Sequence, residues 1–122
     1  MKKKTDMDAL IILKEHLDKI LSGKKTWEMR GGRCLKRGKI ALIESKSGTV
    51  VGTAELVDCI GPLSVAEFNK NLRKSQGSRL RSKEDFYYET TYAWVLKNAK
   101  RFRTPIKYKH KMGVIIWHKV RI

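Results

Sequence analysis

The apolar residues of this sequence come in short runs that glycine, proline and charged residues interrupt, and this spacing constrains the fold more than any other feature. Runs at 8–13, 39–44 and 49–60 are rich in isoleucine, leucine and valine and have the length of β-strands. The Ser47-Gly48 pair between the last two runs predicts a hairpin. Further strand candidates lie at 26–30, 92–96, 105–108 and 113–120.

Three segments between these runs have the pattern of helices. Residues 14–21 carry apolar residues three and four positions apart, and a glycine follows soon after. Ser64 with Glu67 three positions later is typical of a capping box and predicts a helix over 64–72. A third, short helix is predicted within 82–88, with Phe86, Tyr87 and Tyr88 inside it.

One domain is expected, because 122 residues can enclose a single hydrophobic core but are too few for two ordinary ones. Strands and helices do not alternate regularly, which favours an α+β domain of five to six strands around a small closed sheet, with two or three inserted helices. The domain spans 1–122, and the lysine-rich residues 1–6 are predicted to form a flexible basic tail.

The charge balance predicts a polyanionic partner. The sequence holds 28 Lys and Arg against 12 Asp and Glu, a formal net charge of +16. A polyanion relieves the repulsion between these cations and releases its own counterions on binding. Nucleic acid is therefore the expected partner. Two alternatives stay open, namely lysines that only maintain solubility and binding to an acidic membrane surface.

No apolar run approaches the roughly 18 residues of a membrane span, and no apolar signal core follows the first residues. We therefore expect a cytoplasmic protein that does not contact a membrane. Cys34 and Cys59 lack the spacing of a zinc site, and the three histidines are scattered. The sequence accordingly predicts no metal and no cofactor.

Basic residues concentrate in three windows that contain no acidic residue. Windows 30–39, 70–83 and 97–111 hold five, six and seven Lys or Arg residues. If the fold brings the windows to one side, they form a track for a phosphate backbone; the alternative is three separately solvated loops. The nucleic-acid-binding candidates in these windows are Arg33, Lys36, Arg37, Arg79, Arg81, Lys100, Arg101 and Arg103.

The segment 23–30 has the densest arrangement of chemically active side chains. Alternation along a strand would place Thr26, Glu28 and Arg30 on one face and turn Trp27 towards the core. The preceding Lys24 and Lys25 lie at a turn, and Lys25 would reach the same cleft. An exposed ion-pair ladder on the protein surface is the alternative that the spacing leaves open.

This segment resembles the signature of the ASCH (activating signal cointegrator homology) domain family, G-x-K-x-x-E-x-R. The matching residues are Gly23, Lys25, Glu28 and Arg30. Residues 92–96, Tyr-Ala-Trp-Val-Leu, are also similar to the C-terminal half of that family. The resemblance implies a PUA-like β-barrel in which the signature residues line a cleft that binds RNA or another nucleic acid, and RNA is the expected partner rather than DNA.

The resemblance also implies a catalytic alternative, because some relatives are N(4)-acetylcytidine amidohydrolases and others are described as ribonucleases. Lys25 matches the catalytic lysine of the amidohydrolases, whereas Glu28 stands where those enzymes have threonine. They also use a glutamate in the helical insertion, and Glu89 is the favoured candidate here over Glu67 and Glu84. If the protein is an enzyme, its predicted catalytic residues are Lys25, Glu28 and Glu89.

Aromatic residues provide candidates for stacking on unpaired bases. Tyr88, Tyr92 and Trp94 are the candidates, and packing in the core is the alternative for each. Taken together, the sequence predicts a monomeric RNA-binding domain with a basic face and a signature cleft. A hydrolase acting on a modified nucleoside or on RNA is the second hypothesis, and a protein-interaction module with no identified partner is the third.

Overall fold

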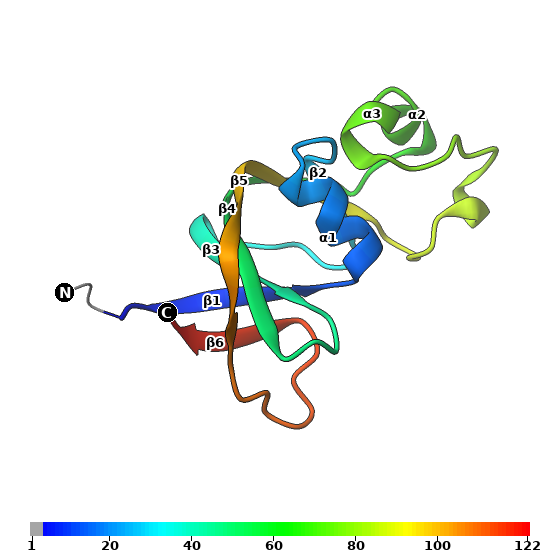
Figure 1. Ribbon diagram of the computed structural model, residues 1–122. Coiled ribbons are helices and arrows are strands. Elements are labelled where there is room, and N and C mark those ends of the chain that lie inside the picture. The colour runs from blue at the N-terminus through cyan, green and yellow to red at the C-terminus, as the bar shows by residue number, and fades with distance from the viewer. Residues whose placement is uncertain (1–3) are drawn as a thin grey trace.

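The computed structural model describes residues 4–122 and contains a single six-stranded sheet (Figure 1). The strands lie side by side in the order β2-β5-β4-β3-β1-β6. Only β1 and β3 run parallel, and every other neighbouring pair is antiparallel. The bounds are β1 Asp6–Ile12, β2 Trp27–Arg30, β3 Gly38–Glu44, β4 Thr49–Ile60, β5 Tyr92–Lys107 and β6 Trp117–Arg121.

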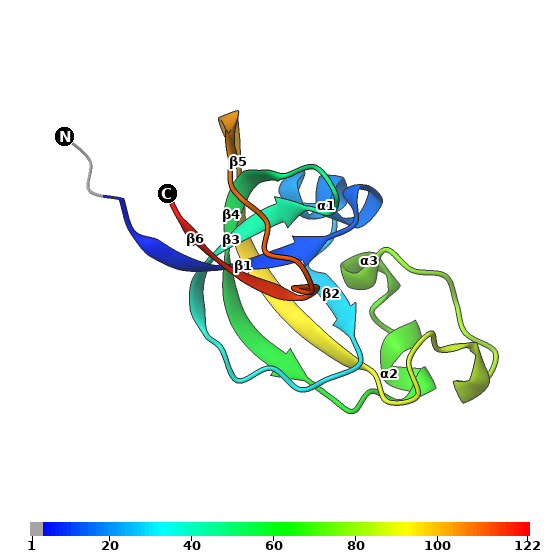
Figure 2. The ribbon, with the colours of Figure 1, turned by 90° about the horizontal axis from the view of Figure 1, so that it is seen from below.

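The sheet curls into a barrel-like shape with β2 and β6 at its edges (Figure 2). The expected α+β fold of five to six strands with inserted helices is confirmed. The predicted hairpin is also confirmed, since β3 and β4 pair from Gly38 with Leu56 to Glu44 with Thr49. The tail predicted over residues 1–6 does not include Thr5 and Asp6, because the Thr5 amide donates to the Ile122 carbonyl and β1 begins at Asp6. Residues 1–3 lie outside the described residues.

Strand β5 is one continuous element of 16 residues, where the sequence predicts two separate strands. The intervening segment 97–104 is polar and basic, which suggested a loop. It remains extended because β4 supplies its hydrogen-bonding partners, with three shifts of register along the pair. Such bulges increase the local twist, so a single long strand contributes to the curl of the sheet.

The helices fill two connections. Helix α1, Lys14–Leu21, follows β1 as predicted and buries Leu17 and Ile20. The capping box is present at Ser64, but its helix α2 ends at Asn69, and a second short helix, α3 (Leu72–Ser75), follows. The third helix is a single 3-10 turn, η1 (Lys83–Asp85). Phe86, Tyr87 and Tyr88 lie after this turn rather than inside a helix, which corrects the prediction.

The main core lies between the curled sheet and α1. Its fully buried members include Leu10, Leu17, Leu42, Leu56 and Leu96. A smaller cluster joins β2 to the connection between β4 and β5. Its buried members are Trp27, Leu63 and Ala93, so the expected core position of Trp27 is confirmed.

The connection between β4 and β5, residues 61–91, contains α2, α3 and η1 and is called the insertion below. It extends to one side of the sheet, next to β2 and α1 (Figures 1 and 2). The Thr26 amide in β2's leading turn donates to the Lys74 carbonyl of α3, which ties the insertion to the sheet. Within residues 4–122, every helix is too short or too polar to cross a membrane.

Candidate nucleic-acid cleft

The turn between α1 and β2 carries the first signature residues. Gly23 closes α1 with a φ of +83°, a conformation that glycine adopts without strain. The Lys25 amide then donates to the Lys19 carbonyl, which folds the chain back over the end of the helix. This return directs Lys25 inward, whereas Lys24 remains exposed.

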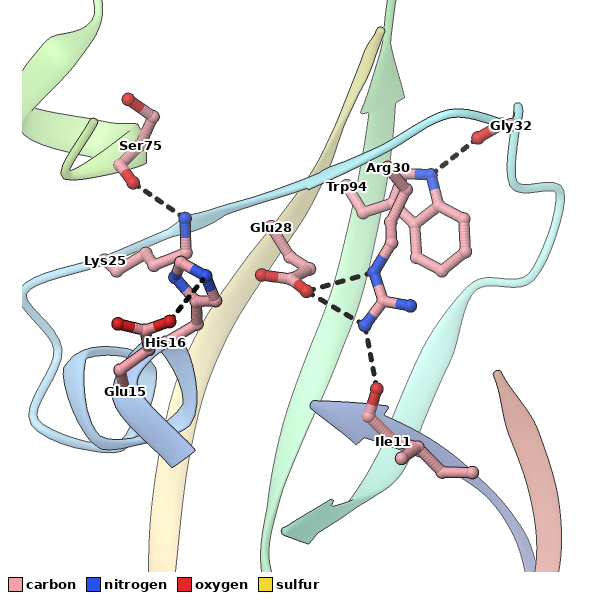
Figure 3. A network of polar contacts seen from close by, with 9 residues as sticks. All are labelled: Ile11, Glu15, His16, Lys25, Glu28, Arg30, Gly32, Ser75 and Trp94. Atoms are coloured by element: carbon pink, nitrogen blue, oxygen red, sulfur yellow. Dashed lines mark hydrogen bonds and ion pairs between the residues drawn. The ribbon is translucent and has the colours of Figure 1, made fainter. Parts of the chain in front are cut away.

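The Lys25 side chain is buried, with 4% of its surface exposed. Its Nζ donates a hydrogen bond of 2.7 Å to the Ser75 carbonyl at the end of α3 (Figure 3). Burial lowers the pKa of Lys25 below the ordinary lysine value, Glu28 opposes that decrease in pKa, and the charges of Lys19 and Arg30 add to it. Lys25 is therefore a desolvated cation rather than a surface lysine.

Glu28 and Arg30 form a buried ion pair beside Lys25. The Arg30 Nε and Nη2 atoms lie 3.0 and 2.9 Å from Glu28 Oε2. The same Nη2 donates to the Ile11 carbonyl at 2.8 Å, which holds the pair against the end of β1. Because Glu28 is only 5% exposed, the exposed ion-pair ladder that the sequence left open is wrong.

The ring of Trp94 packs against the Arg30 side of this ion pair. The Arg30 guanidinium lies 5.6 Å from the Trp94 ring centroid, within the range of a cation–π contact. Trp94 is buried, donates from Nε1 to the Gly32 carbonyl and stacks on Trp117. Trp94 is thus a core residue, and its candidacy for stacking on a base is wrong.

A cleft of about 600 Å³ opens in front of these side chains. Its walls come from β2, the first turn of α1, the insertion and the loop before β6. The signature contributes Lys25, Glu28 and Arg30, and the expected cleft between the sheet and the first helix is where these three meet. The lining also includes Glu15, His16, Ser75, Tyr87, Tyr88 and Ile115.

Two parts of this cleft escaped the sequence analysis. Glu15 and His16 face it from the start of α1, and their side chains lie 3.8 Å apart at the nearest nitrogen and oxygen. Tyr87 borders it with 92% of its surface exposed. Tyr87 could have been predicted from its position next to Tyr88. Nothing local in the sequence indicates that the first turn of α1 faces the signature residues.

The aromatic candidates separate in the structure. Tyr88 lines the cleft and packs on Gly31, and Tyr87 contacts it edge-on with ring centroids 4.9 Å apart. Tyr92 lies outside the cleft lining, and the Arg33 guanidinium covers its ring at 5.0 Å. Tyr88 and its neighbour Tyr87 are therefore the rings available to a molecule in the cleft.

Other predicted site residues lie away from the cleft. Glu89 is exposed and does not line it, so the helical insertion does not bring this carboxylate to Lys25. The backbone of Thr26 bonds to Lys74 and Leu96, and its side chain is outside the lining. Residues 4–122 contain no group of three or more His, Cys, Asp or Glu side chains placed to hold a metal ion.

The basic candidates are distributed over several elements, and some of them are already paired. Ion pairs join Lys36 to Asp8, Arg81 to Asp85 and Arg101 to Asp18, at 2.9, 3.3 and 3.0 Å. Arg37 donates mainly to neighbouring carbonyls. Apart from Lys25 in the cleft, the basic candidates without an ion-pair partner within the described residues are Lys24, Arg33, Arg79, Lys100 and Arg103. The insertion and the far end of β5 lie at opposite ends of the molecule in Figure 1.

The curled sheet, with α1 after its first strand and the insertion before β5, defines a small barrel-like α+β domain with a cleft at the signature residues. The sequence profile of the ASCH domain matches residues 10–106. The chain therefore belongs to the ASCH domain family.

Solved structures share this fold. The crystal structure of ASCH from Zymomonas mobilis is similar with a TM-score of 0.66 and 24% sequence identity, over 82% of this chain and 72% of that chain. A Tyr-to-Phe variant of the same protein gives 0.65 and 24%, over 82% and 74%. No curated protein matches the sequence.

Proposed function

We propose that this protein binds single-stranded RNA, with a base or nucleotide in the signature cleft and the phosphate backbone on the basic surfaces around it. The observation that carries the proposal is the cleft itself, in which buried Lys25 and the Glu28–Arg30 pair lie behind the exposed ring of Tyr87. The family is PUA-like and associated with RNA binding, which supports the same conclusion.

The chemistry of the cleft fits a base better than a phosphate group. The Glu28 carboxylate repels an anion, and Arg30 is already committed to Glu28 and to the Ile11 carbonyl. Tyr87 and Tyr88 provide flat apolar surfaces of the kind on which unpaired bases stack. Lys25 has three N–H donors, of which Ser75 accepts one, so it can donate to a ring nitrogen or carbonyl of a base.

The phosphate backbone then belongs to the surface outside the cleft. Exposed cations lie on segments that line the cleft, among them Lys24 next to Lys25 and Arg79 two positions after Gly77. With a formal net charge of +16, the molecule attracts a polyanion over its whole surface. The cleft would then hold one nucleotide while the flanking phosphates meet lysine and arginine.

A hydrolase acting on a modified nucleoside is the second candidate, and the lowered pKa of Lys25 favours it. A desolvated lysine is a stronger candidate for a general base than an exposed one. Glu28 opposes this function, because an ionised carboxylate accepts hydrogen bonds and would repel a developing oxyanion. We therefore expect little deacetylation of N(4)-acetylcytidine by the natural protein.

The test compares Lys25→Met with Lys24→Met in binding to short single-stranded RNA. Lys25→Met should weaken binding about tenfold or more, because a hydrogen bond from a charged donor contributes about 1.5–3 kcal/mol and 1.4 kcal/mol is tenfold. Lys24→Met, an exposed neighbour, should have a much smaller effect. Thermal melts of both variants check that each is folded. Equal RNA binding by the two folded variants would contradict a role for the cleft.

Mass spectrometry of RNA and of N(4)-acetylcytidine incubated with the protein tests for catalysis. A protein that only binds should leave both molecules intact. Robust deacetylation by the natural protein that Glu28→Thr abolishes would assign the cleft to catalysis, with Glu28 as the base. Shortened RNA that disappears with Lys25→Met would indicate a ribonuclease.

A further inference from the structure

The two carboxylate oxygens of Glu28 have different surroundings. Oε2 accepts from both Nε and Nη2 of Arg30. No hydrogen bond reaches Oε1 among residues 4–122, and since no fully buried polar side-chain atom there lacks a partner, Oε1 remains accessible from the cleft although Glu28 as a whole is only 5% exposed. In Figure 3 this second oxygen points away from Arg30, towards the side of the cleft where Lys25 and His16 lie.

Oε1 needs a hydrogen-bond donor once a ligand covers it, because a carboxylate oxygen that loses water without gaining another donor costs free energy. Lys25 does not supply the donor, since its Nζ is bonded to Ser75 and is beyond ion-pair distance of Glu28. Before a ligand binds, the donor must come from solvent in the cleft. A ligand that displaces the solvent must therefore bring an N–H or O–H group to the same place.

The Arg30 contacts fix the position of this acceptor. The guanidinium is held by Glu28, by the Ile11 carbonyl and by the Trp94 ring, so the carboxylate cannot easily turn. An ionised carboxylate accepts hydrogen bonds and donates none. A carbonyl oxygen placed against Oε1 would be repelled, whereas an amino group would be bound.

We propose that Glu28 Oε1 selects the base in the cleft by accepting a hydrogen bond from an exocyclic amino group. Cytosine, adenine and guanine each carry such a group beside a ring nitrogen that accepts, and Lys25 is placed to donate to that nitrogen. Uracil can donate to Oε1 only from its N3–H. A carbonyl oxygen flanks that N–H on each side, so one of the two oxygens lies against the carboxylate and is repelled in either orientation. This inference rests on the proposed RNA binding and names the bases that the cleft prefers.

The first experiment leaves the protein unchanged. Single-stranded oligomers of cytidine, adenosine and uridine, equal in length and at one salt concentration, are compared in affinity. Oligocytidine and oligoadenosine should bind roughly tenfold more tightly than oligouridine, the discrimination that one good contact to a base edge provides. Replacing both hydrogens of each cytosine amino group with methyl groups should reduce the affinity of oligocytidine to that of oligouridine.

The second experiment uses Glu28→Gln, which replaces the acceptor Oε1 with a hydrogen-bond donor. The glutamine carbonyl can still accept from Arg30, while its amide nitrogen presents donors to the cleft. The preference for cytidine over uridine should fall to about one or invert, in a variant whose thermal melt shows it to be folded. A control variant, Glu67→Gln in the insertion, alters an exposed carboxylate outside the cleft and should keep the preference.

The possible failures are distinguishable. Tight but equal binding of all three oligomers, or of dimethylated and natural oligocytidine, would overturn the selection by Glu28 and leave RNA binding standing. A Glu28→Gln variant that folds and keeps the preference would also overturn it. Absence of binding to any oligomer would overturn the proposed function itself. The dimethylated oligomer decides the question even if Glu28→Gln does not fold.

Discussion

Lys25 places an ammonium group where water has little access, so folding changes the affinity of that group for a proton. Its pKa is lowered in the folded protein, chiefly by burial. At a pH below the lowered value, the buried charge reduces stability. Between that value and the unfolded value of about 10.4, the unfolded chain binds more protons, so the free energy of unfolding contributed by this group rises with pH.

We therefore expect Lys25→Met to remove a rise in stability with pH in the alkaline range. The measurement is urea denaturation of the natural protein and of the variant at several pH values from neutral upwards. The difference between the two free energies of unfolding isolates residue 25, because the other titrating groups are common to both. Lys24→Met, at an exposed position, should follow the natural protein. Parallel curves for Lys25→Met and the natural protein would contradict the assigned burial of this charge.

At the scale of elements, the insertion forms a wall of the cleft and rests on the end of β2. A Cβ atom added at Gly31 would lie 2.7 Å from Tyr88 Cδ1, too close to be accommodated without moving the ring. The backbone of Gly31 has an ordinary φ, so alanine introduces no conformational strain there. Gly31→Ala therefore displaces Tyr88, and Tyr87 with it, without changing any charge.

We expect Gly31→Ala to weaken RNA binding by about threefold or more, or about 0.7 kcal/mol, while costing at most roughly 1–3 kcal/mol of stability. Gly32→Ala is the matched control, because a Cβ there meets no atom within 4 Å. Both variants are compared by RNA affinity and thermal melting. If Gly31→Ala binds RNA as tightly as Gly32→Ala, the tyrosine wall is not part of the interface.

Local patterns predicted several elements well. The three- and four-residue spacing of Leu17, Ile20 and Leu21 identified α1, and the Ser64–Glu67 capping box forms as expected, since both features depend on neighbours within one turn of helix. The continuity of β5 was missed, because its polar middle is extended only through pairing with β4. A strand held by a distant partner has no complete local signal.

At the scale of the whole molecule, the net charge governs association with a polyanion. The formal charge is +16, and basic residues lie in the turn before β2, in the insertion and on β5. Ion pairs to Asp8, Asp18 and Asp85 are exposed and contribute little to stability, so their lysine and arginine partners can be drawn to phosphate instead. The sequence predicts that three basic windows form one continuous path for a phosphate backbone. This prediction holds only if a bound RNA strand contacts all three windows.

We expect the logarithm of RNA affinity to fall linearly with the logarithm of salt concentration, by about 0.7 for each phosphate neutralised on a single strand. A slope steeper than about −2 is the expected value for a strand that contacts several cations. Arg79→Ala in the insertion and Arg103→Ala on β5 should each reduce the slope only if the strand passes that surface. An affinity independent of salt would contradict binding through the phosphate backbone.

The sequence by itself determined most of the strands, α1, the capping box and the basic character, and the Gly23–Arg30 signature identified the family. These features lie in composition or in neighbours a few positions apart. Only the tertiary structure decided that Glu28 is buried, that Arg30 reaches the Ile11 carbonyl and that Lys25 bonds to Ser75, 50 positions away. It also placed Glu89 outside the cleft and Tyr87 beside it, because a side chain's neighbours across a cleft depend on how distant segments pack.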